Sequence, residues 1–403
     1  MKRENQRRHT PGSFLTDLYR SAARQMREIL SDLGVITFVF LVPLGYPVVY
    51  AFIYTNETVR EVPVVAVDKA DTPASREFLR RTDASPDIRI AYRAGDMQEA
   101  EELLARKKAY GIVYLPPEFE KQTVRGEQAT VSLYCDMSSL LKYKAMLATL
   151  TDVSLDMGRE LQADGLDGLT LRQAQSAVLP IDNQWTPLFN IHSGFAGFLI
   201  PAILVLIVQQ TMLLGIGMST GTARQQRRMR DFVLSPGGSV LAALLGRCLV
   251  YTLLYTAIVT YMAVVIPGIF SLPRIGSPIT LVLFLAPYLL ACAFFSMLLA
   301  TVLRTREACM PAFVFTSVPF LFLSGISWPQ ASVPLVWKIV GWFVPSTSGI
   351  QGFIKIDSMG ACLADVRFEY LSLWALTLLY GVLAYAAYER IGRRLPAVSG
   401  GGK

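Results

Sequence analysis

Hydrophobic positions in this chain gather into six long runs that are almost free of charged side chains. A helix needs roughly 20 apolar residues to cross a hydrocarbon layer about 30 Å thick. The fifth run is shorter than the others, and two prolines in the first, Pro43 and Pro47, are expected to kink its helix. We therefore predict six transmembrane helices, at residues 33–54, 193–219, 240–267, 278–303, 308–323 and 371–389.

The stretch between the first two runs, residues 55–192, has ordinary polarity and a different periodicity. Short β-branched runs alternate there with helical patterns, which predicts a compact α/β domain followed by a helical return to the membrane. The predicted strands are residues 62–68, 88–93, 110–116 and 129–136, and the predicted helices are 71–82, 95–109 and 117–126. Four aspartates stand at the ends of these elements, where turn and cap roles are expected rather than catalysis: Asp68, Asp71, Asp96 and Asp136.

The N-terminal segment, residues 1–32, contains an amphipathic helix directly before the first span. Between residues 14 and 30, apolar side chains recur at spacings of three and four, with basic residues between them. The basic face suits an anionic membrane surface. Packing of the apolar stripe on a soluble partner is the alternative.

The segment between the fifth and sixth runs, residues 324–370, is apolar but interrupted. Its hydrophobic stretch at 335–344 is too short to cross a bilayer and is bounded by prolines. Trp328, Trp337 and Trp342 gather there, as aromatic residues do at membrane interfaces. We expect a re-entrant or interfacial helix.

Charge sets the expected orientation. Only 17% of the 403 residues are charged, the net charge is +7, and 52% are hydrophobic. Basic residues near span ends favour the cytoplasmic side. They follow spans two, four and six: Arg224, Arg227, Arg228, Arg230, Arg304, Arg306, Arg390, Arg393 and Arg394. We predict a bacterial inner-membrane protein with both termini cytoplasmic (including the tail 390–403) and residues 55–192 outside. The first run is too long for a cleaved signal peptide, so an uncleaved anchor is expected.

Motifs for catalysis are absent from the sequence. We find no phosphate-binding loop, no nucleophile elbow at a strand-to-helix turn, no zinc-protease motif, and no metal-ligand spacing of cysteine and histidine. We therefore expect no enzyme activity, cofactor or metal in this chain. Arg247 is the ionisable residue inside a span, and we expect its guanidinium to extend to the interface. The sequence leaves open whether Cys135 and Cys362, both expected outside, form a disulfide.

Polar residues within the spans are the candidates for a translocation path. Exposing the side-chain amides of Gln209 and Gln210 to lipid would cost free energy, so these residues are expected to face the protein interior or a path. Thr252, Thr256 and Thr260 share one helical face. Helix packing through hydroxyl groups is the alternative for the threonines.

The order and spacing of several short motifs resemble the ABC-2 type permeases, the membrane subunits of ATP-binding-cassette exporters, in the branch with a large external domain between the first two spans. The motifs are Ser324-Gly325, Trp328-Pro329 and Pro345-Ser346-Thr347 before the last span, and Gly221-Thr222, Ser235-Pro236 and Gly246-Arg247 around the basic segment. In that family, the first group belongs to an external helical hairpin, and the loop between spans two and three docks on the ATPase.

The resemblance implies that residues 220–239 form a coupling loop. Its candidate residues are Gly221, Thr222, Arg224, Arg227, Arg228, Arg230, Asp231, Ser235 and Pro236. Positive-inside anchoring is the alternative role for the arginines. The implied partners are a cytoplasmic ATPase carrying ATP and magnesium, a second permease that is a copy or a sister chain, the bilayer and periplasmic adaptors, with no nucleic acid. The acidic residue usual before the Gly-Thr pair is absent here.

Two other functions fit parts of the sequence. A membrane-anchored sensor or scaffold would bind a ligand through the external α/β domain, but would need only one or two spans and a cytoplasmic output domain. A secondary transporter would need intramembrane acids or an inverted repeat, and neither is evident. A permease subunit of an exporter is the function that we predict.

Overall fold

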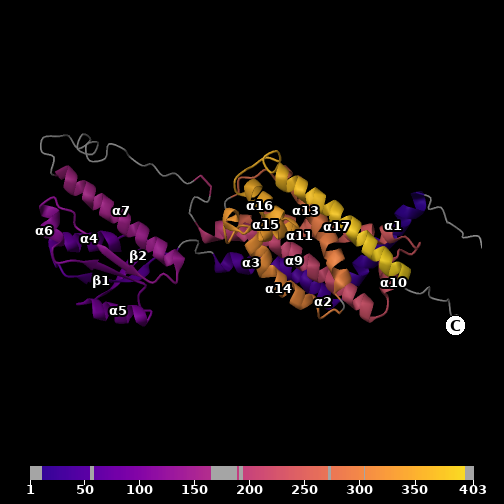
Figure 1. Cartoon of the computed structure of the whole chain (residues 1–403), viewed down its shortest axis with the longest axis horizontal. Coiled ribbons are helices and arrows are strands. Elements are labelled where there is room, and N and C mark those ends of the chain that lie inside the picture. The colour runs from indigo at the N-terminus through magenta and orange to yellow at the C-terminus, as the bar shows by residue number, and fades with distance from the viewer. Residues whose placement is uncertain are drawn as a thin grey trace, which may run out of the picture. The chain divides into compact units, whose positions relative to one another are not determined.

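The computed structural model describes residues 11–54, 59–164, 188–189, 194–270, 274–303 and 305–394 (Figure 1). The chain divides into two compact units, a helical unit of Met1–Thr55 and Leu188–Lys403 and an α/β unit of Asn56–Pro187. The first ten residues, the end of the predicted helical return, Arg304 and the tail beyond residue 394 lie outside the described residues.

The helical unit contains five helices, within the described residues, that are long and apolar enough to cross a membrane. The first is continuous through α2 (Leu33–Ile36), the π-helical turn η1 (Thr37–Leu41) and α3 (Val42–Ile53). The others are α9 (Phe195–Gln225), α11 (Val240–Thr260) continued by η2 (Tyr261–Val265) and α12 (Ile266–Phe270), α13 (Pro278–Val302) and α17 (Arg367–Arg394).

Shorter helices complete the helical unit. They are α1 (Pro11–Ser31), α10 (Met229–Val233), α14 (Cys309–Leu323), η3 (Gln330–Ser332), α15 (Leu335–Trp342) and α16 (Pro345–Asp357). The predicted fifth span corresponds to α14, whose 15 residues make it shorter than the five candidate spans. A count of six spans therefore stays a prediction.

The core of the helical unit is built around α9, which is buried along most of its length and packs against α13, α14 and α16. Its neighbour α13 also packs along α17. Aromatic rings of α13 fill the space between these helices, since Tyr288 and Phe284 are both fully buried. In Figure 1 the long helices of this unit lie side by side.

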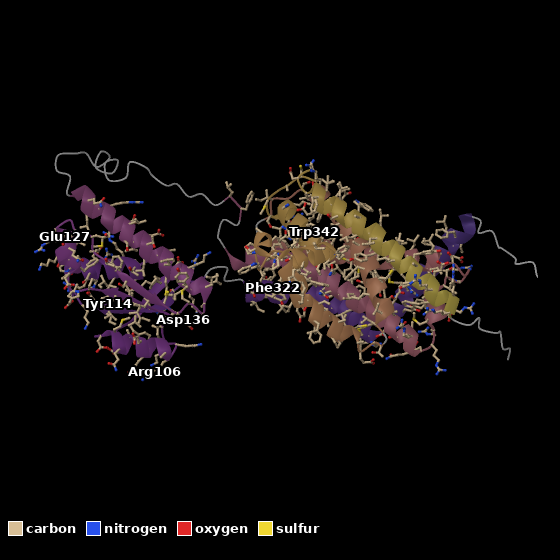
Figure 2. The ribbon with its side chains drawn as sticks, in the orientation of Figure 1. Arg106, Tyr114, Glu127, Asp136, Phe322 and Trp342 are labelled. Carbon is tan, nitrogen blue, oxygen red and sulfur yellow. The ribbon has the colours of Figure 1, made fainter. Side chains whose placement is uncertain are left out.

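The segment before the last span folds as a hairpin of two short helices. The predicted helix at 335–344 is α15, and Trp337 and Trp342 on it are exposed. Trp342 is labelled in Figure 2. The second arm, α16, is buried along its first six residues and again at Gly352 and Phe353. Gly349 and Gly352 make this possible, because a Cβ at either position would collide with the ring of Tyr288 or Phe284.

The α/β unit has a four-stranded mixed sheet in the order β2-β1-β3-β4. Strand β1 is parallel to β2 and β3, and β4 is antiparallel to β3. Figure 1 shows α4, α6 and α7 on one face of the sheet and α5 on the other. The elements are β1 (Val62–Asp68), α4 (Pro73–Asp83), β2 (Ile88–Arg93), α5 (Met97–Ala105), β3 (Gly111–Leu115), α6 (Phe119–Val124), β4 (Ser132–Cys135) and α7 (Leu140–Asp164).

All four strands and three helices predicted between residues 62 and 136 are present. Their ends are fixed as expected by short polar side chains. Asp96 caps α5 by accepting from the amide of Glu99 at 2.8 Å, and Asp68 accepts from the amides of Ala70 and Asp71. Thr72 and Ser75 form a reciprocal capping box at α4. Cys135 and Cys362 are both free thiols in this structure.

A buried carboxylate ends α16. The backbone carbonyl of Asp357 accepts from the amides of Ile275 and Gly276 at 2.9 and 3.1 Å, which ties α16 to the connection before α13. The Asp357 side chain is 8% exposed and its Oδ1 lies 3.6 Å from Nε of Arg274. Burial raises the pKa of Asp357 to about 6, although the positive charge of Arg274 acts in the opposite direction.

This pKa predicts that the stability of the protein falls as pH rises. Because the folded-state pKa is raised, the stabilising contribution is fully present below the unfolded pKa and is lost as pH rises through about 6. Between pH 5 and pH 7.5 we expect a loss of about 1–2 kcal/mol. Asp357→Asn should flatten this profile, whereas exposed Asp365→Asn should leave it unchanged. Thermal unfolding midpoints of the detergent-solubilised protein across this pH range measure both, and an equally steep profile for Asp357→Asn would contradict the assignment.

Candidate functional site

The predicted coupling segment is more helical than its sequence suggested. Helix α9 continues to Gln225, beyond the predicted span end at residue 219, so Gly221, Thr222 and Arg224 lie in its last turns. The chain then reverses at Arg227, which has a positive φ of 57°. The short helix α10 follows, and the Ser235–Gly238 turn leads to Ser239, which caps α11.

Gly221 and Thr222 join α9 to the connection between α13 and α14. A Cβ on Gly221 would lie 2.7 Å from backbone atoms of Arg306, so only glycine permits this approach. The guanidinium of Arg306 donates to the hydroxyl of Thr222 at 3.1 Å. The Gly-Thr pair therefore has a structural role inside the helical unit.

The same guanidinium forms an ion pair with Asp32 at the start of the first span. Nη2 of Arg306 donates to Oδ1 of Asp32 at 2.7 Å. Asp32 also caps α2 by accepting from the amides of Gly34 and Val35 at 3.0 and 3.3 Å. Burial acts to raise the pKa of Asp32, but the hydrogen bonds from Arg306 and these amides hold it below its ordinary value. We call Asp32, Thr222 and Arg306 the Arg306 cluster.

The four arginines of the predicted segment have different surroundings. Arg224 donates to the carbonyls of Leu303 and Thr301 at 2.9 and 3.0 Å, and so caps the C-terminus of α13. Arg230 is half-buried, whereas Arg227 and Arg228 are exposed beside the exposed side chain of Asp231. Arg228 bonds to its neighbour Gln226 at 2.9 Å. Arg227 and Arg228 are thus the two arginines of this set that extend to the surface.

Helix α10 is anchored by Phe232, whose ring covers Arg247 of α11. The guanidinium carbon of Arg247 lies 3.1 Å from the centroid of that ring, a cation–π contact. Tyr388 of α17 lies next to the same ring, at 6.5 Å between centroids. Arg247 is only 4% exposed, so the expectation that it extends to the interface is wrong. The aromatic rings of α10 and α17 enclose its guanidinium inside the protein.

The N-terminal helix α1 packs on α11 through its polar face. Asp17, Ser21 and Gln25 are buried, whereas Leu15 and Tyr19 are 65% and 72% exposed. The approach is close, because a Cβ on Gly246 would lie 2.9 Å from the carbonyl oxygen of Leu18. Arg24 of α1 donates to the backbone carbonyl of Asp231. Helix α1 is therefore attached to both α11 and α10. Its apolar stripe is divided, because Ile29 is buried in the core whereas Leu15 and Leu30 are exposed.

Of the predicted path residues, Gln210 lines a cavity. This cavity of about 330 Å³ lies between α3, α9 and α14, and Tyr46 and Tyr50 of α3 also line it. Nε2 of Gln210 lies 3.4 Å from Oγ1 of Thr316 on α14. Tyr46, Tyr50 and Thr316 are not among the predicted path residues, although the two tyrosines recur at the helical spacing of four.

The other predicted path residues lie elsewhere. Gln209 is fully buried, and its Oε1 accepts from the amide of Ser346 at 2.7 Å, so it caps α16. Thr256 and Thr260 are exposed on α11, and their hydroxyls donate to carbonyls one turn earlier on the same helix. Thr252 lies on this face too. The threonines do not line the cavity of Gln210.

The hairpin motifs also have local explanations. Gly325 adopts a positive φ of 85° directly after α14, which favours glycine. The carbonyl of Ser324 accepts from Nε2 of Gln351 at 3.0 Å, joining α14 to α16. Pro345 occupies the first turn of α16, where its missing N–H costs nothing. Trp328 is exposed and Pro329 precedes η3.

The α/β unit contains a separate groove of about 650 Å³ between α6, the loop that connects α6 to β4, and α7. Phe78, Phe119 and Met157 form its apolar floor, and Glu127, labelled in Figure 2, lies at its rim. Its mixed lining is typical of a small-ligand site. In the part of the chain that the structure describes, no group of three or more His, Cys, Asp or Glu residues could hold a metal ion.

Comparison with protein families gives one extensive match. Residues 34–386 match the family described as ABC-2 family transporter protein. The matched region overlaps every candidate span and contains the α/β unit, the predicted coupling segment and the α15–α16 hairpin. No curated protein matches the chain.

The Arg306 cluster predicts energetic coupling between distant parts of the chain. Asp32→Asn and Arg306→Gln should each destabilise the protein by about 1–3 kcal/mol, because each leaves a partly buried partner without its bond. The double variant should lose clearly less than the sum of the two. Thermal unfolding in detergent measures this cycle. Arg393→Gln, which removes an exposed pair with Glu389, serves as control and should change stability by less than about 0.5 kcal/mol. Strict additivity of the two cluster variants would contradict the coupling.

Proposed function

The chain belongs to the ABC-2 family of transporter proteins, and from this we propose that it is the permease subunit of an exporter driven by a separate cytoplasmic ATPase. As an ABC-2 permease it is a multi-pass membrane protein and a transport subunit that is not itself catalytic. ATP and magnesium belong to the partner. The observation that carries the coupling proposal is the position of α10. Its residues Met229, Phe232 and Val233 are buried against the spans, whereas Asp231 and the preceding Arg227 and Arg228 are exposed.

Coupling occurs at α10 and the turns that flank it. Arg227, Arg228 and Asp231 supply the face that meets the ATPase, with Pro236 in the adjoining exposed turn. On the opposite face of α10, the ring of Phe232 contacts the guanidinium of Arg247 on α11. A movement of α10 would therefore be transmitted directly to the spans. Gly221, Thr222, Arg224 and Ser235 act as positioning residues, because their contacts lie inside the helical unit. Arg230 stands at the edge of this face.

In this proposal the protein crosses a bacterial inner membrane six times with both termini in the cytoplasm, and α14 is the fifth span. The α/β unit and the α15–α16 hairpin lie on the periplasmic side. The α/β unit receives substrate in its groove, next to any periplasmic adaptor. The groove alone also favours the second candidate, a sensor or scaffold that binds a ligand there.

Transport takes place between two permeases that associate through α14. Cys309 is the fully buried residue of this helix, whereas Val314, Phe315 and Val318 are 59%, 78% and 56% exposed. The cavity lined by Gln210, between α3, α9 and α14, lies next to this face. Its lining combines aromatic rings with one amide, which suits hydrophobic or amphipathic substrates.

The coupling proposal predicts that Arg227→Ala with Arg228→Ala lowers ATP hydrolysis by the assembled complex about tenfold, toward the rate of the isolated ATPase. Membrane insertion should be unaffected, since both side chains are exposed. The measurement uses tagged permease purified gently with its ATPase. Arg390→Ala with Arg394→Ala removes equal charge from α17 and should leave hydrolysis unchanged. If no ATPase accompanies the wild-type chain, the sensor or scaffold becomes the better function.

The dimer proposal predicts oxidative cross-linking at α14. In a parent chain with Cys135→Ser and Cys362→Ser, Phe315→Cys should yield a covalent dimer in native membranes. Leu378→Cys on α17 is similarly exposed, at 68%, and should remain monomeric. Gel mobility without reductant provides the readout. Equal cross-linking at both positions, or at Leu378 alone, would argue against α14 as the interface.

A further inference from the structure

A second cavity in the helical unit has four arginines in its lining. It has a volume of about 470 Å³ and lies between α1, the start of α2 and the last turns of α9. The transport proposal uses only its edge, at Arg228. Its charged lining residues are Arg24, Arg27, Arg228, Arg306, Glu28 and Asp32.

The charges of this cavity do not balance. Four guanidinium groups face two carboxylates, and one carboxylate, Asp32, is already bonded to Arg306. Glu28 is then the one carboxylate in the lining that can balance the charges of Arg24, Arg27 and Arg228. The cavity therefore carries an excess of two positive charges, which a bound anion would neutralise.

Several guanidinium donors remain available for such an anion. Arg27 makes no side-chain hydrogen bond or ion pair with any residue that the structure describes. Arg24 uses one nitrogen to reach the carbonyl of Asp231, and Arg228 uses Nε and Nη2 on Gln226. Each of these two retains a further nitrogen. Guanidinium groups bind phosphate oxygens in pairs of parallel hydrogen bonds, so this donor set fits a phosphate group.

We propose that this cavity binds the phosphate group of an anionic ligand, either a lipid headgroup or a soluble phosphate compound. The volume lies within the range of small-ligand sites. Leu33 lines the cavity, is 78% exposed and begins the first candidate span. An acyl chain leaving the cavity would meet this apolar surface, which favours the lipid.

The ligand would fasten α1 to α9. Arg27 and Arg24 come from α1, and Arg228 follows α9 after one turn. Like charges on these elements repel each other when the cavity is empty, and a bound phosphate would bridge them. This role goes beyond the proposed transport function and does not require the ATPase.

The test uses the full chain alone in neutral detergent micelles, without ATPase. Thermal unfolding is followed with added dioleoyl-phosphatidylglycerol, with dioleoyl-phosphatidylcholine and with inorganic phosphate. At about 100 times the dissociation constant, a bound anion should raise the unfolding midpoint by on the order of 5 °C. Arg27→Glu should abolish the shift. Arg20→Glu on the exposed side of the same helix is the matched control and should keep it.

Each arm of this experiment decides one point. A shift with phosphatidylglycerol alone assigns the site to a lipid, and a shift with inorganic phosphate as well assigns it to the phosphate group itself. If Arg27→Glu fails to fold, Arg27→Gln replaces it and should weaken binding about tenfold. No shift with either anion, or equal shifts in the Arg27 and Arg20 variants, overturns the proposal. Failure of the ATPase to co-purify would leave this result untouched.

Discussion

The ion pair between Arg306 and Asp32 is the interaction on which the rest of the helical unit depends. It links the cap of the first span to the connection between α13 and α14, and Thr222 extends it to α9. Partly buried polar groups at span ends cannot be left unpaired without a cost in free energy. This single guanidinium bonds to the cap of α2 and to the last turns of α9. The short distance between Gly221 and the Arg306 backbone then fixes how far apart those elements can lie.

The arginine-rich segment combines two tasks that the sequence could not separate. Arg224 and Arg247 serve the interior, one as a cap for α13 and the other beneath Phe232. Arg227 and Arg228 point to the surface. Composition reports only that basic residues gather at one end of the spans. Which of them reaches solvent depends on where α9 stops, and that end lies six residues beyond the predicted span boundary.

The predictable and unpredictable parts of this structure differ in the range of the interactions that fix them. Strands such as Val62–Asp68 and caps such as Asp96 follow from periodicity and from neighbours within a few residues. Helix α16 was not assigned from periodicity, and only the family resemblance implied a second helical arm there. It forms because Gly349 and Gly352 fit against the rings of α13, and Gln209 caps it from α9. The partners Asp32 and Arg306 are 274 residues apart, a separation that no local pattern reveals.

The docking of α1 on α11 has a consequence for the order of assembly. Gln25 donates to the hydroxyl of Tyr251, a partner 226 residues later in the chain. At synthesis rates of about 5–20 residues per second, Tyr251 is made roughly 10 to 45 seconds after Gln25. During that interval the whole α/β unit is produced while the polar face of α1 has no partner on α11. Helix α1 therefore cannot dock until α11 has been made, even though it precedes the α/β unit in the chain.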